Sequence, residues 1–260
     1  MAAALLLTGC GSASESASDS ADPGRNEDAA APVDATKSLR DACLSAMPAE
    51  AELEAFTLTG RTDGELSAAR IGAGSSRTVA VLLPQTSGMC GWGRWAHAVA
   101  GSGVTSILVD PCGYGESICS EDGDADPLNE VAPAAAYARE ELGAERVVLV
   151  GTSMGGSLTV QAAAAGADVD SWVDVSGPSA WEGVDQDDIV ADLPAGGLVV
   201  YARSDGDLEY RRARDLAQRS RARFLDGGSG HGWDLLTTYE GRLLRPGRVV
   251  LAQVRGADDA

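Results

Sequence analysis

The sequence predicts an α/β fold: a mostly parallel, twisted sheet of about eight strands with helices on both faces. Short, nearly continuous apolar runs such as Thr78–Leu83 are typical of strands that are buried on both faces. Segments with helical periodicity separate these runs, which is the pattern of βαβ units. Such units connect parallel strands by right-handed crossovers, so the sheet is expected to be mostly parallel.

The expected elements follow this pattern from about residue 36. A short helix at 36–47 ends before Pro48, and a hairpin follows at 54–59 and 66–71 around the turn signal Thr62-Asp63-Gly64. The remaining expected strands are 78–83, 105–109, 146–150, 171–175, 197–201 and 222–225. The remaining expected helices are 92–101, 130–142, 154–165, 208–220 and one after Pro246.

Composition narrows the possible partners. The 260 residues carry a formal net charge of -19, and 44% of them are hydrophobic. The hydrophobic share is sufficient for a substantial core. An acidic surface repels phosphate backbones, so we expect no nucleic-acid partner.

The N-terminal residues differ from the rest of the chain. Residues 1–10 are short and apolar and end in Leu7-Thr8-Gly9-Cys10, which resembles a bacterial lipobox with Cys10 as the lipidated residue. Residues 11–35 are rich in Ser, Ala and Asp and are expected to form a flexible tether. The globular domain is then 36–260, located outside the cytoplasm and bound to the bacterial cell membrane through Cys10, or secreted. The alternative is a disordered cytosolic N-terminus with a chance cysteine.

Four further cysteines fit an exported protein. Four cysteines allow three pairings, and the sequence does not choose among them. Cys112 and Cys119 flank a turn, and a bond between them would leave Cys43 to pair with Cys90 and tie the N-terminal segment to the body. Free buried thiols are the alternative.

A strand-to-helix turn at Gly151-Thr152-Ser153-Met154-Gly155-Gly156 carries the candidate nucleophile, Ser153. Such a sharp turn exposes the serine hydroxyl above the sheet, and its small neighbours meet the steric demand. A glycine-rich turn with no catalytic role is the alternative.

A serine hydroxyl needs a base, and the chain contains two histidines. His231 lies in a glycine-rich loop after an expected strand, whereas His97 lies within an expected helix. His231 is therefore the predicted base. The orienting carboxylate should follow the strand at 197–201, which favours Asp205, with Asp207 as the rival.

An oxyanion hole requires two backbone amides. The residue after the nucleophile, Met154, should supply one. The loop after 78–83 should supply the other, and because Pro84 has no N–H, the donor is Gln85 or Thr86; the offset from the strand end favours Thr86.

These motifs resemble the α/β-hydrolase fold superfamily from about residue 54 to the C-terminus. Asp110-Pro111-Cys112-Gly113-Tyr114-Gly115-Glu116-Ser117 is similar to the family's D-x-R-G-x-G-x-S loop, and Gly151–Gly156 matches its nucleophile elbow. Pro84-Gln85 replaces the family's frequent His-Gly, and Cys112 replaces the loop arginine. About twenty residues separate 175 from 197. They are expected to form one helix and a loop, which leaves room only for a minimal cap and predicts an open site. Trp92, Trp181 and Trp233 are its candidate walls.

The resemblance implies a serine hydrolase that cleaves a carboxylic ester or related acyl bond of a small-molecule substrate. No cofactor is expected, and the cysteine and histidine spacing predicts no metal site. A non-catalytic binding protein of the cell envelope is the alternative from another class. A peptidase or a dienelactone-type hydrolase is the alternative within the enzymes, because the fold does not fix the bond that is cleaved.

Overall fold

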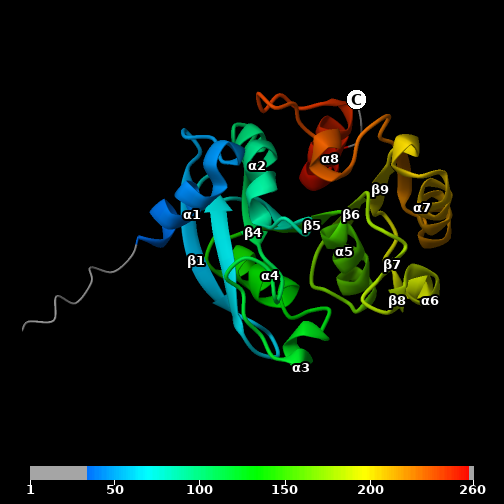
Figure 1. The fold of residues 1–260 in the computed structure, drawn as a ribbon, viewed down its shortest axis with the longest axis horizontal. Helices are drawn as coiled ribbons and strands as arrows, with labels where there is room; N and C mark the ends of the chain where they lie inside the picture. Colours follow the sequence, from blue (N-terminus) through cyan, green and yellow to red (C-terminus); the bar gives the residue numbers. More distant parts are fainter. Residues whose placement is uncertain (1–33, 258–260) are drawn as a thin grey trace, which may run out of the picture. The chain divides into compact units, whose positions relative to one another are not determined.

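The computed structural model of the protein describes residues 34–257. The predicted lipidation site at Cys10 and most of the predicted tether lie outside these residues. An eight-stranded sheet runs through the described part in the order β1-β2-β4-β3-β5-β6-β9-β10 (Figure 1). The bounds are β1 Leu53–Thr59, β2 Glu65–Ile71, β3 Thr78–Leu83, β4 Val104–Val109, β5 Arg146–Thr152, β6 Ser171–Val175, β9 Leu198–Tyr201 and β10 Arg223–Asp226.

All strand pairs from β4 to β10 are parallel, whereas β2 runs antiparallel to both β1 and β4. The carboxyl ends of β3, β5, β6 and β9 therefore meet at one edge of the sheet. The register between β5 and β6 pairs Thr152 with Val175. This edge is where loops from distant parts of the sequence meet, as is usual for open parallel sheets.

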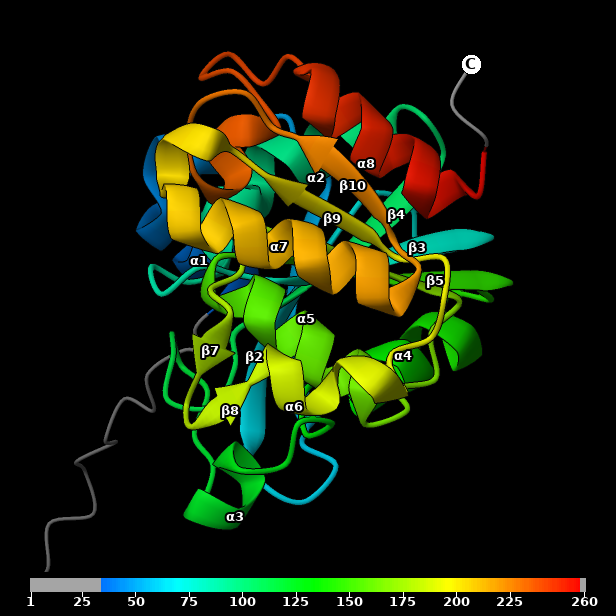
Figure 2. The ribbon, with the colours of Figure 1, turned by 90° about the vertical axis from the view of Figure 1, so that its right-hand side faces the viewer.

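Helices cover both faces of the sheet. One face packs against α1 (Ala35–Cys43), α2 (Gly93–Ala100) and α8 (Arg245–Arg255). The other packs against α4 (Val131–Glu140), α5 (Met154–Ala164) and α7 (Asp207–Ser220). Figure 2 shows α8 and α7 on opposite sides of β9 and β10. The predicted architecture of a mostly parallel sheet between two helical layers is confirmed.

Strand β3 illustrates why both faces of the sheet are apolar. Val79, Val81 and Leu83 face the α4 and α5 side, while Ala80 and Leu82 face the α2 and α8 side. All five are at most 1% exposed. Full burial of a valine or leucine side chain contributes about 1.5–3 kcal/mol, so the unbroken apolar run is what a two-sided strand requires.

Two disulfides join segments outside the sheet. Cys43–Cys90 links α1 to the short helix η2 (Met89–Trp92), and Cys112–Cys119 closes the loop after β4. These are the two pairings that the sequence analysis raised as a hypothesis, with free buried thiols as the alternative.

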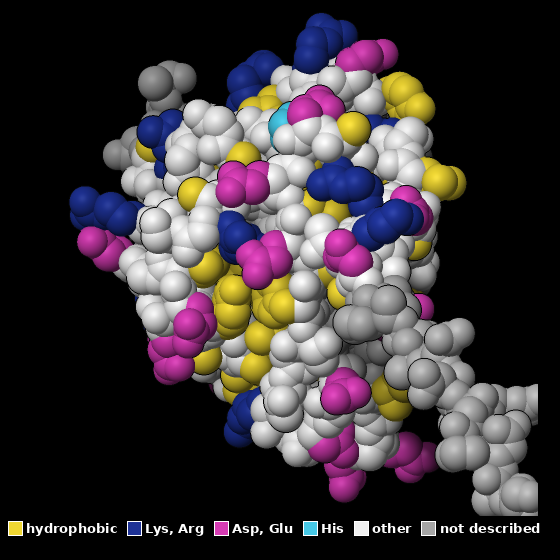
Figure 3. All heavy atoms as spheres, turned by 90° about the vertical axis from the view of Figure 1, so that its left-hand side faces the viewer, with side chains coloured by type: hydrophobic (Ala, Val, Ile, Leu, Met, Phe, Trp, Pro, Cys, Tyr) yellow, Lys and Arg dark blue, Asp and Glu magenta, His cyan; other side chains and the backbone are white. Residues whose placement is uncertain are grey.

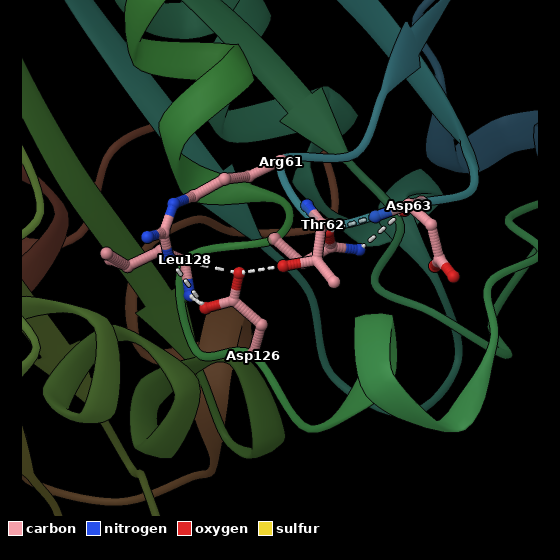
Figure 4. A network of polar contacts seen from close by, with 6 residues as sticks. Arg61, Thr62, Asp63, Asp126 and Leu128 are labelled. Atoms are coloured by element: carbon pink, nitrogen blue, oxygen red, sulfur yellow. Dashed lines mark hydrogen bonds and ion pairs between the residues drawn. The ribbon is translucent and has the colours of Figure 1, made fainter.

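A polar network lies next to the second disulfide. Figure 4 shows three of its residues, Arg61, Thr62 and Asp126. The guanidinium of Arg61 pairs with the carboxylate of Asp126 at 3.0 Å, and the Thr62 hydroxyl donates to the same carboxylate at 2.6 Å. The Asn129 side chain accepts from the Thr62 N–H and lies 3.3 Å from the sulfur of Cys112. The β1–β2 turn is thus fixed to the loop that precedes α4.

The segment between β6 and β9 differs from its prediction. One helix and a loop were expected, but the structure has a two-stranded hairpin followed by two short helices. Their bounds are β7 Ala180–Trp181, β8 Val184–Asp185, α6 Gln186–Ile189 and η3 Val190–Asp192. Strands of two residues produce no detectable alternation in a sequence, so periodicity does not reveal them.

Smaller differences concern element ends. The expected helix at 36–47 is α1 followed by η1 (Leu44–Ala46), and a short helix α3 (Glu121–Asp124) was not expected. The C-terminal helix begins at Arg245, so Pro246 lies within its first turn rather than before it. Proline is tolerated there because the first N–H groups of a helix have no intrahelical acceptor.

Charged side chains of both signs are interspersed on the face beside α1 and β1 (Figure 3). Lys37 pairs with Asp41 along α1, and Arg70 on β2 pairs with Glu54 on β1. Exposed pairs of this kind contribute about 0–1 kcal/mol, so they add little to stability. Within the described residues, no helix combines the length and apolar character needed to cross a bilayer.

Candidate active site

The turn between β5 and α5 holds Ser153 in a strained backbone conformation. Its φ is 52° and its ψ is -121°, in a region that residues other than glycine rarely adopt. The Ser153 N–H donates to the carbonyl of Val175 at 2.9 Å, which ties the turn to the end of β6. Strain of about 1–3 kcal/mol per residue persists only where surrounding contacts impose it, and it is common at reactive groups.

Close backbone approach explains the glycines of this turn. A Cβ atom on Gly151 would lie 1.8 Å from the carbonyl oxygen of Gly155, and one on Gly155 would lie 2.2 Å from that of Leu83. The Gly155 N–H donates to the carbonyl of Pro84 at 2.9 Å. The elbow helix is therefore packed directly against the loop after β3.

The structure brings His231 and Asp205 together. His231 Nδ1 lies 2.6 Å from Asp205 Oδ2, although 26 residues separate them in the sequence. An ionised carboxylate only accepts hydrogen bonds, so Nδ1 carries the proton and Nε2 is left with a free lone pair. This is the tautomer that a general base requires.

Asp205 is presented by the end of β9, as predicted. It closes the short helix η4 (Arg203–Asp205), and its side chain is 18% exposed. Asp207 instead begins α7, is 67% exposed and lies 3.7 Å from Arg203. Asp207 is thus an acidic residue of a helical first turn, where it interacts favourably with the helix dipole.

Two backbone hydrogen bonds position the histidine loop. The Gly230 N–H donates to the hydroxyl of Ser204 at 3.1 Å, and the Gly232 N–H donates to the hydroxyl of Ser176 at 3.1 Å. Ser204 precedes Asp205, and Ser176 directly follows β6. The loop is thereby attached both to the acid and to the strand beside the nucleophile.

The Ser153 hydroxyl makes no hydrogen bond with His231 in the described residues. In unliganded sites this bond is often long and tightens only when substrate binds. His97, by contrast, lies on α2 with Nε2 3.7 Å from a carboxylate oxygen of Glu50.

The three backbone amides that the sequence proposed as oxyanion donors make no hydrogen bond within the described residues. They are the N–H groups of Met154, Gln85 and Thr86. Gln85 is half-buried and Thr86 is exposed. Both Gln85 and Thr86 therefore remain candidates for the second oxyanion donor, beside Met154. The Gln85 side chain lies against Gly232, where a Cβ atom would come within 2.2 Å of its amide nitrogen.

The three candidate tryptophans have different environments. Trp92 is 0% exposed, and its indole N–H donates to the carbonyl of Leu83, so the expectation that it lines the site is wrong. It packs edge-to-face on Trp95 in the core. A helical apolar pattern in a sequence does not distinguish a core residue of this kind from one that lines a site. Trp181 lies half-buried on β7, and the ring of Trp233 lies directly against Gly91.

Two buried carboxyl groups, those of Asp174 and Asp110, and the half-buried carboxyl group of Glu130 lie near the loops at this edge. Burial raises the pKa of Asp174 to about 7, although a hydrogen bond from the Gly177 N–H opposes this shift. Burial also raises the pKa of Glu130 to about 7 and that of Asp110 to about 6, against hydrogen bonds from the N–H groups of Cys112 and Met89. The sequence did not single out Asp174, although an aspartate within an otherwise apolar strand was the available signal.

A small cavity of about 30 Å³ lies beside Met154. It has room for about one water molecule, and Tyr114 and Glu182 contribute to its lining. Within residues 34–257, no group of three or more His, Cys, Asp or Glu side chains converges as a metal site would require.

Comparison with known proteins agrees with the observed fold. Residues 81–205 match the family described as the alpha/beta hydrolase fold. The chain has the α/β-hydrolase fold. No curated protein sequence matches it.

Solved structures with the α/β-hydrolase fold are similar at low identity. An esterase from Pyrococcus furiosus has a TM-score of 0.62 and 13% identity, over 79% of this chain and 89% of that one. A serine hydrolase without lid from Xanthomonas campestris has a TM-score of 0.58 and 19% identity, over 82% and 98%. Acetyl xylan esterase 1 from a Thermoanaerobacterium species has a TM-score of 0.58 and 13% identity, over 80% and 84%.

Proposed function

We propose that this protein is a serine hydrolase that cleaves a carboxylic ester or a related acyl bond through an acyl-enzyme on Ser153. The observation that carries the proposal is the 2.6 Å contact between His231 and Asp205, formed at the same edge of the sheet as the strained serine turn. The esterases and the serine hydrolase among the similar structures support the reaction class.

In the proposed first step, His231 Nε2 takes the proton of the Ser153 hydroxyl while Oγ attacks the carbonyl carbon of the substrate. The carbonyl oxygen becomes negative and accepts hydrogen bonds from the N–H groups of Met154 and Thr86, or of Gln85 in place of Thr86. The start of α5 adds positive potential at this point.

Collapse of the intermediate breaks the bond to the leaving group, which takes the proton from His231. A water molecule then gives a proton to Nε2 and attacks the acyl carbon, and Ser153 leaves with that proton restored. Asp205 holds the imidazole in the required tautomer throughout and stabilises its protonated form.

The location of this reaction belongs to the same proposal. The two disulfides support an oxidising compartment outside the cytoplasm. We propose that lipidation at Cys10 holds the domain at the membrane surface. Growth with labelled palmitate, comparing the full chain with Cys10→Ala, tests this: the label should be lost with Cys10, and equal labelling of both would contradict it.

Turnover of short p-nitrophenyl esters by the purified protein tests the reaction. The wild-type protein should release nitrophenol, and Ser153→Ala should retain the melting temperature but lose turnover. Equal rates for both proteins would contradict the proposal. Absence of turnover across esters, lactones and peptides would favour a non-catalytic binding protein.

A further inference from the structure

Ser176 occupies an unusual position directly after β6. Its φ is 59°, in the left-handed region, and it is 0% exposed. A glycine adopts this conformation without a steric penalty. The chain has a glycine at the next position, Gly177, but a serine at position 176. A serine held here in a strained conformation points to a role for its hydroxyl group.

That hydroxyl accepts the N–H of Gly232, the residue after His231, at 3.1 Å. Both groups of this hydrogen bond are buried. A buried N–H that loses its acceptor is costly, so removing the hydroxyl favours displacement of the loop.

The backbone around Ser176 meets the other two catalytic elements. The Ser176 N–H donates to the carbonyl of Val200 in β9, which leads to Asp205, at 2.9 Å. The carbonyl of the preceding residue, Val175, accepts the N–H of Ser153, also at 2.9 Å. One dipeptide therefore contacts the nucleophile turn, the acid-bearing strand and the histidine loop.

We propose that Ser176 is a positioning residue: through Gly232, its hydroxyl fixes His231 relative to Ser153. This inference rests on the proposed hydrolase function. The contacts of the histidine loop with Ser204 and Asp205 lie on the acid side, so they orient the imidazole toward Asp205. Among the hydrogen bonds of residues 34–257, the bond to Ser176 attaches the loop to the strand beside the nucleophile.

Two variants separate the hydroxyl from the backbone conformation. Ser176→Ala removes the hydroxyl and keeps a side chain in the left-handed region, whereas Ser176→Gly removes the hydroxyl and the strain together. Ser220→Ala is the matched control, because Ser220 is 3% exposed and its hydroxyl donates to Leu216 within α7, away from the site.

Both Ser176 variants should lower kcat on a small ester by on the order of 10²-fold, because a misplacement of about 1 Å costs this much. KM should stay within about threefold, since the hydroxyl contacts no substrate. Amide hydrogen exchange at Gly232 should become faster in both variants, and Ser220→Ala should change neither kcat nor this exchange rate.

Wild-type kcat in Ser176→Gly would overturn the proposal, because backbone conformation alone would then explain the residue. An equal loss in Ser220→Ala would also overturn it. Failure of the hydrolase function is a separate outcome: there, wild-type protein and Ser153→Ala would not differ. The positioning role alone fails when Ser153→Ala is inactive while Ser176→Gly keeps full turnover.

Discussion

Two loops at the carboxyl edge of the sheet are held in different ways. The loop after β4 is closed by Cys112–Cys119 and fixed through Asn129 and Asp126 to the β1–β2 turn. The loop after β10, which carries His231, has no covalent link and is held by hydrogen bonds to Ser176, Ser204 and Asp205. The proposed reaction needs the second loop to tighten on a substrate, whereas it assigns no step to the first loop.

Residues of the two loops should therefore differ in whether they affect turnover or stability. Substitutions in the histidine loop and its partners should change turnover with little effect on folding. Substitutions at the cross-links should change the free energy of unfolding with little effect on the chemical step.

Loss of His231 should have the largest effect. His231→Ala should reduce kcat by on the order of 10⁵- to 10⁶-fold, because the nucleophile then has no base. His97→Ala is the matched control and should retain turnover, since His97 lies on α2 beside Glu50. Comparable losses in ester hydrolysis for the two variants would remove the distinction between the histidines.

The acid should come next. Asp205→Asn should reduce kcat by on the order of 10⁴-fold, because the amide no longer favours the tautomer with a proton on Nδ1. Asp207→Asn should stay within about twofold of wild type, since exposed pairs such as Arg203–Asp207 contribute little. Initial rates with one ester decide between them, and a larger loss in Asp207→Asn would reverse the assignment.

The disulfides should affect stability instead. Replacing both members of Cys43–Cys90 by alanine should lower the free energy of unfolding by about 4 kcal/mol, and replacing Cys112 and Cys119 by about 2 kcal/mol. The difference follows from sequence separations of 47 and 7 residues. Denaturant unfolding measures both. A larger cost for the shorter link would mean that native contacts, not chain entropy, dominate.

A further expected effect is a pH dependence of stability. The pKa of Asp174 is about 7 in the folded protein, against an ordinary value of 3.8. At pH values between these two pKa values, folding is therefore accompanied by the uptake of a proton. The free energy of unfolding should therefore fall as the pH rises from about 4 to 7. The raised pKa values of Glu130 and Asp110 act in the same direction.

Asp174→Asn should flatten this slope, because the amide resembles the protonated acid. Its free energy of unfolding relative to wild type should increase toward pH 8. Unfolding curves at pH 5 and pH 8 give both values, and parallel profiles for the two proteins would exclude Asp174 as a contributor.

Local patterns in the sequence predicted much of this arrangement. The apolar run Thr78–Leu83 predicted the strand, because burial on both faces of a sheet leaves few alternatives. The glycines around Ser153 predicted the strand-to-helix turn, because close backbone approach leaves few alternatives to glycine. The order of strand ends predicted that Asp205 and His231 would meet. Trp92 was misassigned because a helical pattern does not tell which neighbours a side chain has.

Other features depend on contacts between distant segments. The bond between Ser176 and Gly232 joins residues 56 apart, and no local signal marks it. The choice between Gln85 and Thr86 depends on the path of a loop packed against the elbow helix. The hairpin of β7 and β8 is too short to produce a period.

Covalent labelling tests directly whether Ser153 is the nucleophile. The protein would be treated with a fluorophosphonate, and intact mass followed by peptide mapping would locate the adduct. We expect one adduct, on Ser153, that is absent in Ser153→Ala and forms more slowly in both His231→Ala and Ser176→Ala. An unlabelled wild-type protein, or an adduct on another residue, would contradict it.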